Sequence, residues 1–136
     1  MTEADAEALL ASLLSSDVTA LRRQMPLGCK VVDIVVDWAR DRNEPPEIET
    51  IEVKLRDWRG GAGQAYVSTL HVGRASVAMP ANPRRRVDAD YFEELGVGLI
   101  EFDTRGWRRV IQPRVRPRDE TATQVLIRGE CTRGSV

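Results

Sequence analysis

Two neighbouring segments with different side-chain patterns constrain the fold of this chain most strongly. Residues 31–38 read VVDIVVDW, a run rich in β-branched side chains that is typical of a buried strand. Residues 48–55 read IETIEVKL, in which Ile51, Val53 and Leu55 alternate with polar side chains, as in a half-buried strand. Because a polar stretch with two prolines separates the two segments, we expect them to pair as a hairpin.

Helical and further strand patterns surround this hairpin. Thr2 is a predicted N-cap, and leucines at helical spacing follow it, so a helix is expected over residues 3–14. The remaining elements expected in chain order are a strand over 18–25, a helix over 62–72 after Gly60 and Gly61, a buried strand over 75–79, a short helix capped by Asp88 or Asp90 and ended by Gly96, and strands over 97–102 and 107–112. This order predicts an α/β fold, a single-domain mixed β-sheet flanked by helices.

Length and composition agree with one globular domain. The chain has 136 residues, of which 42% are hydrophobic and 30% charged, enough for a hydrophobic core without disulfides. No apolar run approaches the length of a membrane span, and the acidic start is unlike a signal peptide, so we expect a cytoplasmic protein without membrane contact. Residues 1–112 are expected to form the domain, and residues 113–136 a tail that is partly disordered or adds a strand over 123–128.

The scarcity of histidine and cysteine excludes several classes of site. His71 is the single histidine, which argues against histidine triads and histidine-rich metal sites. Cys29 and Cys131 lie far apart in sequence, and we expect both to be unpaired thiols. Arginine is far more frequent than lysine, and its planar guanidinium suits phosphate, which favours a nucleic-acid partner.

Acidic and basic side chains meet on the predicted hairpin. Because side chains alternate along a strand, Glu52 and Lys54 share a face and Val53 points the other way. Asp33 lies among valine and isoleucine, where a charge is costly to bury unless a partner or ligand compensates it. The hairpin would place Asp33 opposite Glu52, and Asp37 is the alternative if the register slips.

Two converging carboxylates suit Mg²⁺ or Mn²⁺, because these hard cations bind oxygen ligands and keep several waters. The backbone carbonyl of Val53 would complete the protein ligands beside Asp33 and Glu52. Lys54 would orient an attacking water or stabilise the negative charge of a phosphoryl transition state. The residues therefore predict a divalent-metal phosphodiesterase site.

Asp33, the triplet Glu52-Val53-Lys54 at a strand end, and Gln64 in the next helix together resemble the PD-(D/E)XK nuclease superfamily. The resemblance covers about residues 3–112 and implies a restriction-endonuclease-like αβββαβ core. It implies that the two acids bind metal, that the lysine is catalytic, and that Gln64 helps to place the lysine and the substrate. It departs from the fullest form of the pattern at Val32, where a proline is expected.

The resemblance has further implications for site and partners. Many members place a glutamate on the first helix, for which Glu7 is the candidate and Glu3 the alternative. The substrate would be DNA, cut by a homodimer or a larger nuclease complex. The alternatives are a non-catalytic nuclease-fold subunit for DNA binding or assembly, and a plain structural module with a solvated Glu-Lys pair. The residues expected to contact the DNA backbone are Arg59, Arg84, Arg85 and Arg86.

Overall fold

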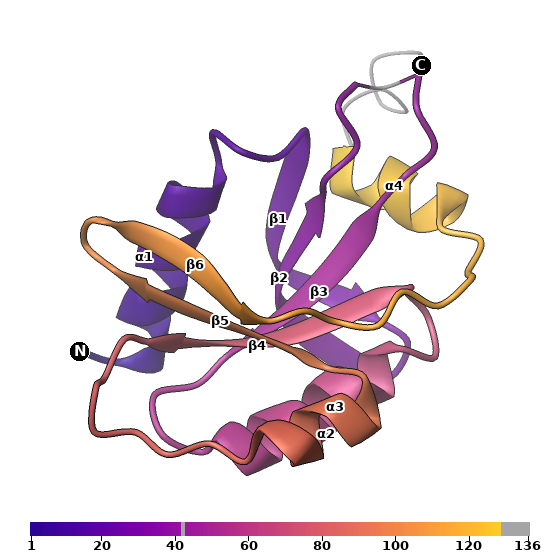
Figure 1. The fold of residues 1–136 in the computed structure, drawn as a ribbon. Coiled ribbons are helices and arrows are strands. Elements are labelled where there is room, and N and C mark those ends of the chain that lie inside the picture. The colour runs from indigo at the N-terminus through magenta and orange to yellow at the C-terminus, as the bar shows by residue number, and fades with distance from the viewer. Residues whose placement is uncertain (42, 129–136) are drawn as a thin grey trace.

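The computed structural model describes residues 1–41 and 43–128 as one mixed β-sheet with helices on both faces (Figure 1). In chain order the elements are α1 (Glu3–Leu14), β1 (Ala20–Leu27), β2 (Lys30–Asp37), β3 (Ile48–Val53), α2 (Trp58–Ser68), β4 (Arg74–Pro80), α3 (Ala89–Leu95), β5 (Gly98–Asp103), β6 (Gly106–Ile111) and α4 (Thr121–Arg128). None of the helices in these two ranges is both long enough and apolar enough to cross a membrane.

The six strands follow the chain order across the sheet, from β1 to β6. The pairs β1–β2 and β2–β3 are antiparallel, β3–β4 and β4–β5 are parallel, and β6 is antiparallel to β5. The order α1, β1, β2, β3, α2, β4 confirms the predicted αβββαβ core, and the helix-flanked mixed sheet confirms the predicted fold class. The carboxyl ends of β3, β4 and β5 lie at one edge of the sheet, where ligands commonly bind in α/β folds.

The sheet buries apolar side chains on both faces. Ala78 in the central strand β4 belongs to the core that also contains Leu10 and Leu14 of α1. Its neighbours Val77 and Met79 belong to the core that contains alanines of α2 and Phe92 of α3. Since neighbouring side chains of a strand point to opposite faces, α1 covers one face and α2 and α3 cover the other (Figure 1).

The first helix begins and ends where the sequence predicts. Thr2 accepts a hydrogen bond from the backbone N–H of Asp5, and the Asp5 side chain accepts one from Thr2, which together form a capping box. The strands predicted before residue 113 also lie within two residues of the observed ones at each end. These agreements come from local signals, namely caps and the alternation of buried side chains.

The second helix begins earlier than predicted, and Gly60 and Gly61 lie inside it. Asp57 caps α2 by accepting from the N–H of Gly60, so Trp58 starts the helix and the expected separation at Gly60 and Gly61 is wrong. A β-carbon added to Gly61 would lie 2.8 Å from Cγ of Lys54 and 3.2 Å from Cγ1 of Val77. Glycine therefore allows α2 to approach the sheet closely beside Lys54.

Residues 113–128 are part of the same domain, and the strand expected over 123–128 is wrong. These residues form α4, whose buried side chains Thr123, Gln124 and Ile127 lie on one helical face toward β1 and β2. The β-branched residues suggested a strand, but the burial recurs with helical spacing and tertiary packing decides the outcome. Cys29 is an exposed free thiol, as predicted, whereas residues 129–136 with Cys131 lie outside the described residues.

Glu120 attaches the segment before α4 to the sheet. Its buried carboxylate accepts hydrogen bonds from the backbone N–H groups of Ile48 at 3.2 Å and Gly73 at 2.6 Å. Ile48 is the first residue of β3 and Gly73 directly precedes β4, so one side chain fixes the amino ends of two central strands. An unsatisfied buried N–H costs free energy comparable to a lost hydrogen bond.

We therefore expect Glu120→Ala to lower the free energy of unfolding by about 1–3 kcal/mol for each N–H left without an acceptor. Urea denaturation measures the loss. Glu94→Ala is the matched control, because Glu94 is an exposed glutamate on α3 and surface substitutions of this kind change stability little. Equal denaturation midpoints for the two variants would contradict the assigned role of Glu120.

Candidate metal site

Four of the predicted site residues line one pocket. They are Asp33 of β2, Glu52 of β3, Lys54 just after β3, and Gln64 of α2. The complete set of lining residues is Glu3, Lys30, Val31, Asp33, Glu52, Lys54, Gln64 and Val67. Residues from two strands and two helices therefore surround the hairpin acids.

The register of the hairpin brings the two acids to this pocket. Ile34 pairs with Ile51, so Asp33 and Glu52 lie one position further along the antiparallel strands. Asp33 Oδ2 accepts a hydrogen bond of 2.8 Å from the backbone N–H of Val53, and this bond fixes the carboxylate at the end of β3. Asp33 is half-buried and keeps lone pairs that a cation can use.

Glu52 is the more buried acid, with a relative exposure of 4%. Burial raises the pKa of its carboxyl above the usual 4.5, the Lys30 ammonium opposes this rise, and the Asp33 carboxyl adds to it. Oε1 of Glu52 lies 2.7 Å from Nζ of Lys30 as an ion pair. Among the described residues, the Lys30 ammonium is the partner of this buried oxygen.

Lys54 lines the pocket without pairing with Glu52. Its side chain is half-buried against α2, and no hydrogen bond or ion pair of its ammonium is found within residues 1–41 and 43–128. We expected the Lys54 ammonium beside Glu52. Lys54 lines the same pocket, but the ammonium that pairs with Glu52 is that of Lys30. The backbone carbonyl of Gln64 accepts from Lys30 at 2.8 Å, and Gln64 is an exposed residue that lines the pocket.

The two glutamates of α1 occupy different positions. Glu3 lines the pocket and accepts from the backbone N–H of Leu55 at 3.3 Å. Glu7, the preferred candidate, is not among the lining residues, since Arg23 at 2.8 Å and Gln24 at 2.6 Å donate to its carboxylate. Glu7 reaches the site indirectly, because the Gln24 amide also donates to Asp33 at 3.4 Å.

Gln24 adopts a backbone conformation that is unusual for its residue type. Its φ of 52° lies in the left-handed region, and the neighbouring pairs Arg23–Ile34 and Met25–Val32 place it opposite Asp33. Such strain persists only where the surroundings enforce it, and it is common near functional sites.

Asp37, the alternative ligand, is fully buried and accepts hydrogen bonds from Ala39, Glu47 and Gln124, so it lies in a different hydrogen-bond network.

The predicted DNA-contacting arginines differ in their availability. Arg85 donates to the backbone carbonyls of Pro80 at 2.6 Å and Leu55 at 3.1 Å, which ties its loop to the end of β3. Its neighbours Arg84 and Arg86 are exposed beside that end of the strand. Arg59 is exposed as well, with its guanidinium carbon 4.9 Å and 4.5 Å from the ring centroids of Trp58 and Tyr91.

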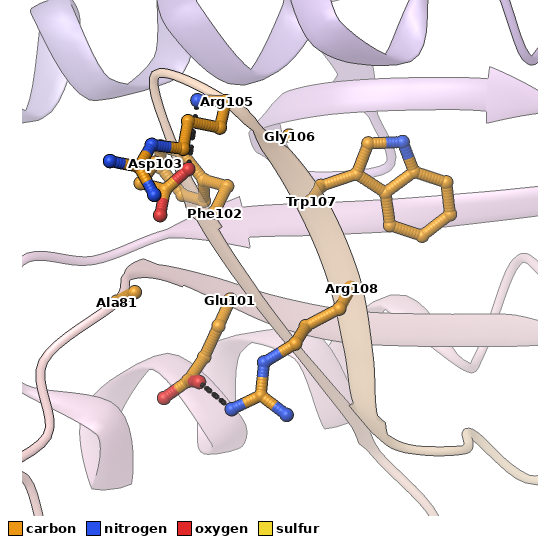
Figure 2. Close-up of a pocket in the computed structure, with 8 residues that line it drawn as sticks. All are labelled: Ala81, Glu101, Phe102, Asp103, Arg105, Gly106, Trp107 and Arg108. Atoms are coloured by element: carbon orange, nitrogen blue, oxygen red, sulfur yellow. Dashed lines mark hydrogen bonds and ion pairs between the residues drawn. The ribbon is translucent and has the colours of Figure 1, made fainter.

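A second hollow, at the β5–β6 hairpin, does not offer free acids (Figure 2). Glu101 is paired with Arg108 at 2.6 Å, and Asp103 accepts from the backbone N–H of Arg105 at 2.8 Å, as the dashed lines in Figure 2 show. In both places one acid is paired with a basic side chain, Glu101 with Arg108 and Glu52 with Lys30. The two differ in burial, because Asp103 is exposed whereas Asp33 is half-buried and Glu52 buried. The hairpin pocket of Asp33 and Glu52 is therefore the better candidate for a metal.

The donor set of this pocket fits a hard divalent cation that keeps several waters. Two carboxylates converge there, and the buried oxygen Oε1 of Glu52 has the Lys30 ammonium as its partner among the described residues. Across residues 1–41 and 43–128 no group of three or more histidine, cysteine, aspartate or glutamate side chains is arranged to hold a metal, so water, phosphate or a carbonyl would supply the other ligands. The Val53 carbonyl stays a prediction as a further ligand.

The raised pKa of Glu52 has a consequence for stability. Because the folded state holds the proton more tightly, the contribution of Glu52 to the free energy of unfolding falls as the pH rises from 4.5 through its folded pKa. We compare the free energy of unfolding of the parent with that of Glu52→Gln in metal-free buffer. The difference, parent minus variant, should fall as the pH rises from 4.5 through the folded pKa of Glu52. Carboxyl ¹³C NMR gives the pKa directly, and a titration of Glu52 at or below 4.5 would disprove the raised pKa.

Comparisons with known proteins bear on the fold alone. No protein-family model matches the chain, and no curated protein matches it. A solved structure described as "SPO1766 protein of unknown function" from Silicibacter pomeroyi is similar, with a TM-score of 0.66 and 18% sequence identity over 99% of this chain and 88% of that chain. This likeness shows that the fold recurs in another protein.

Proposed function

We propose that this chain is a Mg²⁺- or Mn²⁺-dependent nuclease that hydrolyses phosphodiester bonds in DNA. The observation that carries the proposal is the convergence of Asp33, Glu52 and Lys54 in one pocket beside Gln64. The chain order of these residues, and the elements that bear them, match the pattern by which the sequence resembles PD-(D/E)XK nucleases.

Asp33 and Glu52 would hold the metal through carboxylate oxygens. When bound, the cation would supply Lewis-acid activation of a phosphate oxygen and of a water molecule. The hydrogen bond from Val53 orients Asp33, and the buried position of Glu52 limits the water that competes for its oxygens. Both acids line the pocket in which the cation would bind.

Lys54 would stabilise the negative charge that develops on the phosphate. Its ammonium has no partner among the residues that the structure describes, so it is available to a substrate. A positively charged donor that is already in place stabilises a transition state without reorganisation. Gln64 faces the same pocket and would help to place the substrate or the lysine.

Exposed arginines near the end of β3 would bind the DNA backbone. Arg85 fixes the loop of residues 81–88 against Leu55, one residue beyond Lys54. The exposed side chains of Arg84 and Arg86 therefore lie in a loop that is tied to the catalytic strand. We also propose a cytoplasmic location and action as a homodimer or within a larger complex, as expected for a small nuclease.

A second candidate function is a nuclease-fold subunit that binds DNA or a partner without cutting. The ion pair between Lys30 and Glu52 favours this alternative, because the ammonium already neutralises one of the two metal-binding carboxylates. If that pair were permanent, the site would have no need of a divalent cation. Metal-binding calorimetry on the parent protein distinguishes the two candidates.

Lys54→Met should keep the fold and the metal but lower the cleavage rate by about 10²- to 10³-fold, the cost of removing one preorganised electrostatic donor. Methionine retains the apolar stem that packs beside Gly61. Glu52→Gln should instead lose metal binding and cleavage together. The measurements are calorimetry with Mn²⁺ and cleavage of labelled DNA with Mg²⁺ or Mn²⁺.

Equal cleavage rates for the parent and Lys54→Met would show that Lys54 does not stabilise the transition state of cleavage. If the parent binds DNA yet neither binds a divalent cation nor cuts any of a panel of DNA forms, the non-catalytic alternative replaces the nuclease proposal.

Arg84→Ala combined with Arg86→Ala should weaken DNA binding across sequences and reduce the slope of log affinity against log salt by about one for each phosphate that is no longer neutralised. Arg85 is kept because it supports the loop through backbone carbonyls. Arg40→Ala is the control, since Arg40 is exposed after β2, at the opposite end of the hairpin from Lys54. An unchanged slope in the double variant would show that neither arginine contacts a DNA phosphate.

A further inference from the structure

Lys30 links the hairpin to α2 inside the proposed metal site. It begins β2, where it pairs with Leu27, and its ammonium donates to the backbone carbonyl of Gln64 at 2.8 Å. The same ammonium lies 2.7 Å from Oε1 of Glu52. One cation is therefore held between a buried carboxylate of β3 and the backbone of α2.

The contact with Glu52 is a short ion pair. A buried carboxylate needs a compensating charge, and Lys30 supplies it. However, the pocket is lined by three acids, Glu3, Asp33 and Glu52, and by two lysines, Lys30 and Lys54. Among the described residues, Lys30 pairs with Glu52 alone, so Asp33 is not paired with an ammonium.

A divalent cation between Asp33 and Glu52 would compensate both acids, but it cannot share an oxygen with the ammonium. At the short distances of metal coordination, two positive charges at the same carboxylate oxygen repel each other strongly. The side chain of Lys30 is 22% exposed, so it has a route toward solvent when it leaves Glu52. Lys54 has no such conflict, because it is not paired with Glu52.

We propose that the Lys30 ammonium and a divalent cation are mutually exclusive partners of Glu52 Oε1, and that Lys30 occupies the place of the cation until metal binds. This inference rests on the proposed metal site and adds a positioning role for a residue outside the resemblance to nucleases. Under this proposal, metal affinity depends on the free energy needed to separate the Lys30 ammonium from Glu52.

The first test is a calorimetric titration with Mn²⁺ at about pH 8. Lys30→Met removes the charge and keeps most of the apolar length of the side chain, so the variant should bind Mn²⁺ about fivefold or more tightly than the parent, a change typical of coupled binding events. Arg40→Met is the matched control, because it removes one positive charge from an exposed side chain after β2, at the opposite end of the hairpin from the pocket. It should leave the affinity near that of the parent.

The second test observes the parent protein itself, so it remains decisive if Lys30→Met does not fold. The chain contains two lysines, Lys30 and Lys54, and ¹⁵N-lysine labelling therefore gives two side-chain ammonium resonances. Addition of Mg²⁺ should shift the Lys30 resonance and speed the exchange of its protons as the ion pair breaks. The charge-conserving variant Lys30→Arg assigns the resonance.

The outcomes separate this inference from the proposed function. Metal binding by the parent with an unchanged Lys30 resonance, or with equal affinity in Lys30→Met, overturns the exclusion and leaves the metal site standing. Binding by Lys30→Met alone supports the exclusion and rejects the proposed catalytic function of the parent. Absence of metal binding in both proteins overturns both.

Discussion

In the β2–β3 hairpin Ile34 pairs with Ile51, and this register decides where the charged groups of the candidate site lie. A shift by one residue would turn one of the two acids toward the α1 core, where burial of a charge is costly. With the observed register, Asp33 accepts a hydrogen bond from the backbone N–H of Val53, and Glu52 is buried beside Asp33. Because the neighbouring side chains of Ile34 and Ile51 are packed in the core on the α1 face, both acids point to the opposite face of the sheet.

Burial of Glu52 then creates a need for positive charge, which the chain can meet in two ways. Lys30 meets it in the metal-free protein, at the cost of leaving Asp33 without an ammonium of its own. A divalent cation would meet it for both acids and would leave Lys54 to act on the substrate. Under the proposed function, whether the site is catalytic thus depends on the competition between an ammonium and a metal for one carboxylate.

The sequence predicted the parts of the fold that depend on local signals. The capping box at Thr2, the cap at Asp88 and the alternation of Ile51 and Val53 gave helix and strand positions close to the observed ones. It failed at α4, because packing against β1 and β2 overrides the strand propensity of its β-branched residues. It also missed Lys30, since strand alternation assigns Lys30 and Asp33 to opposite faces, whereas a long side chain at a strand end reaches across to Glu52.

Binding of one divalent cation by Asp33 and Glu52 together is the step on which the proposed chemistry depends. The most direct measurement is an anomalous difference map from a crystal grown with Mn²⁺. We expect a peak that both carboxylates contact at ligand distances of about 2.0–2.3 Å, with the Lys30 ammonium moved away from Glu52. A well-ordered pocket without such a peak, in which Lys30 still pairs with Glu52 at saturating Mn²⁺, would contradict the metal site.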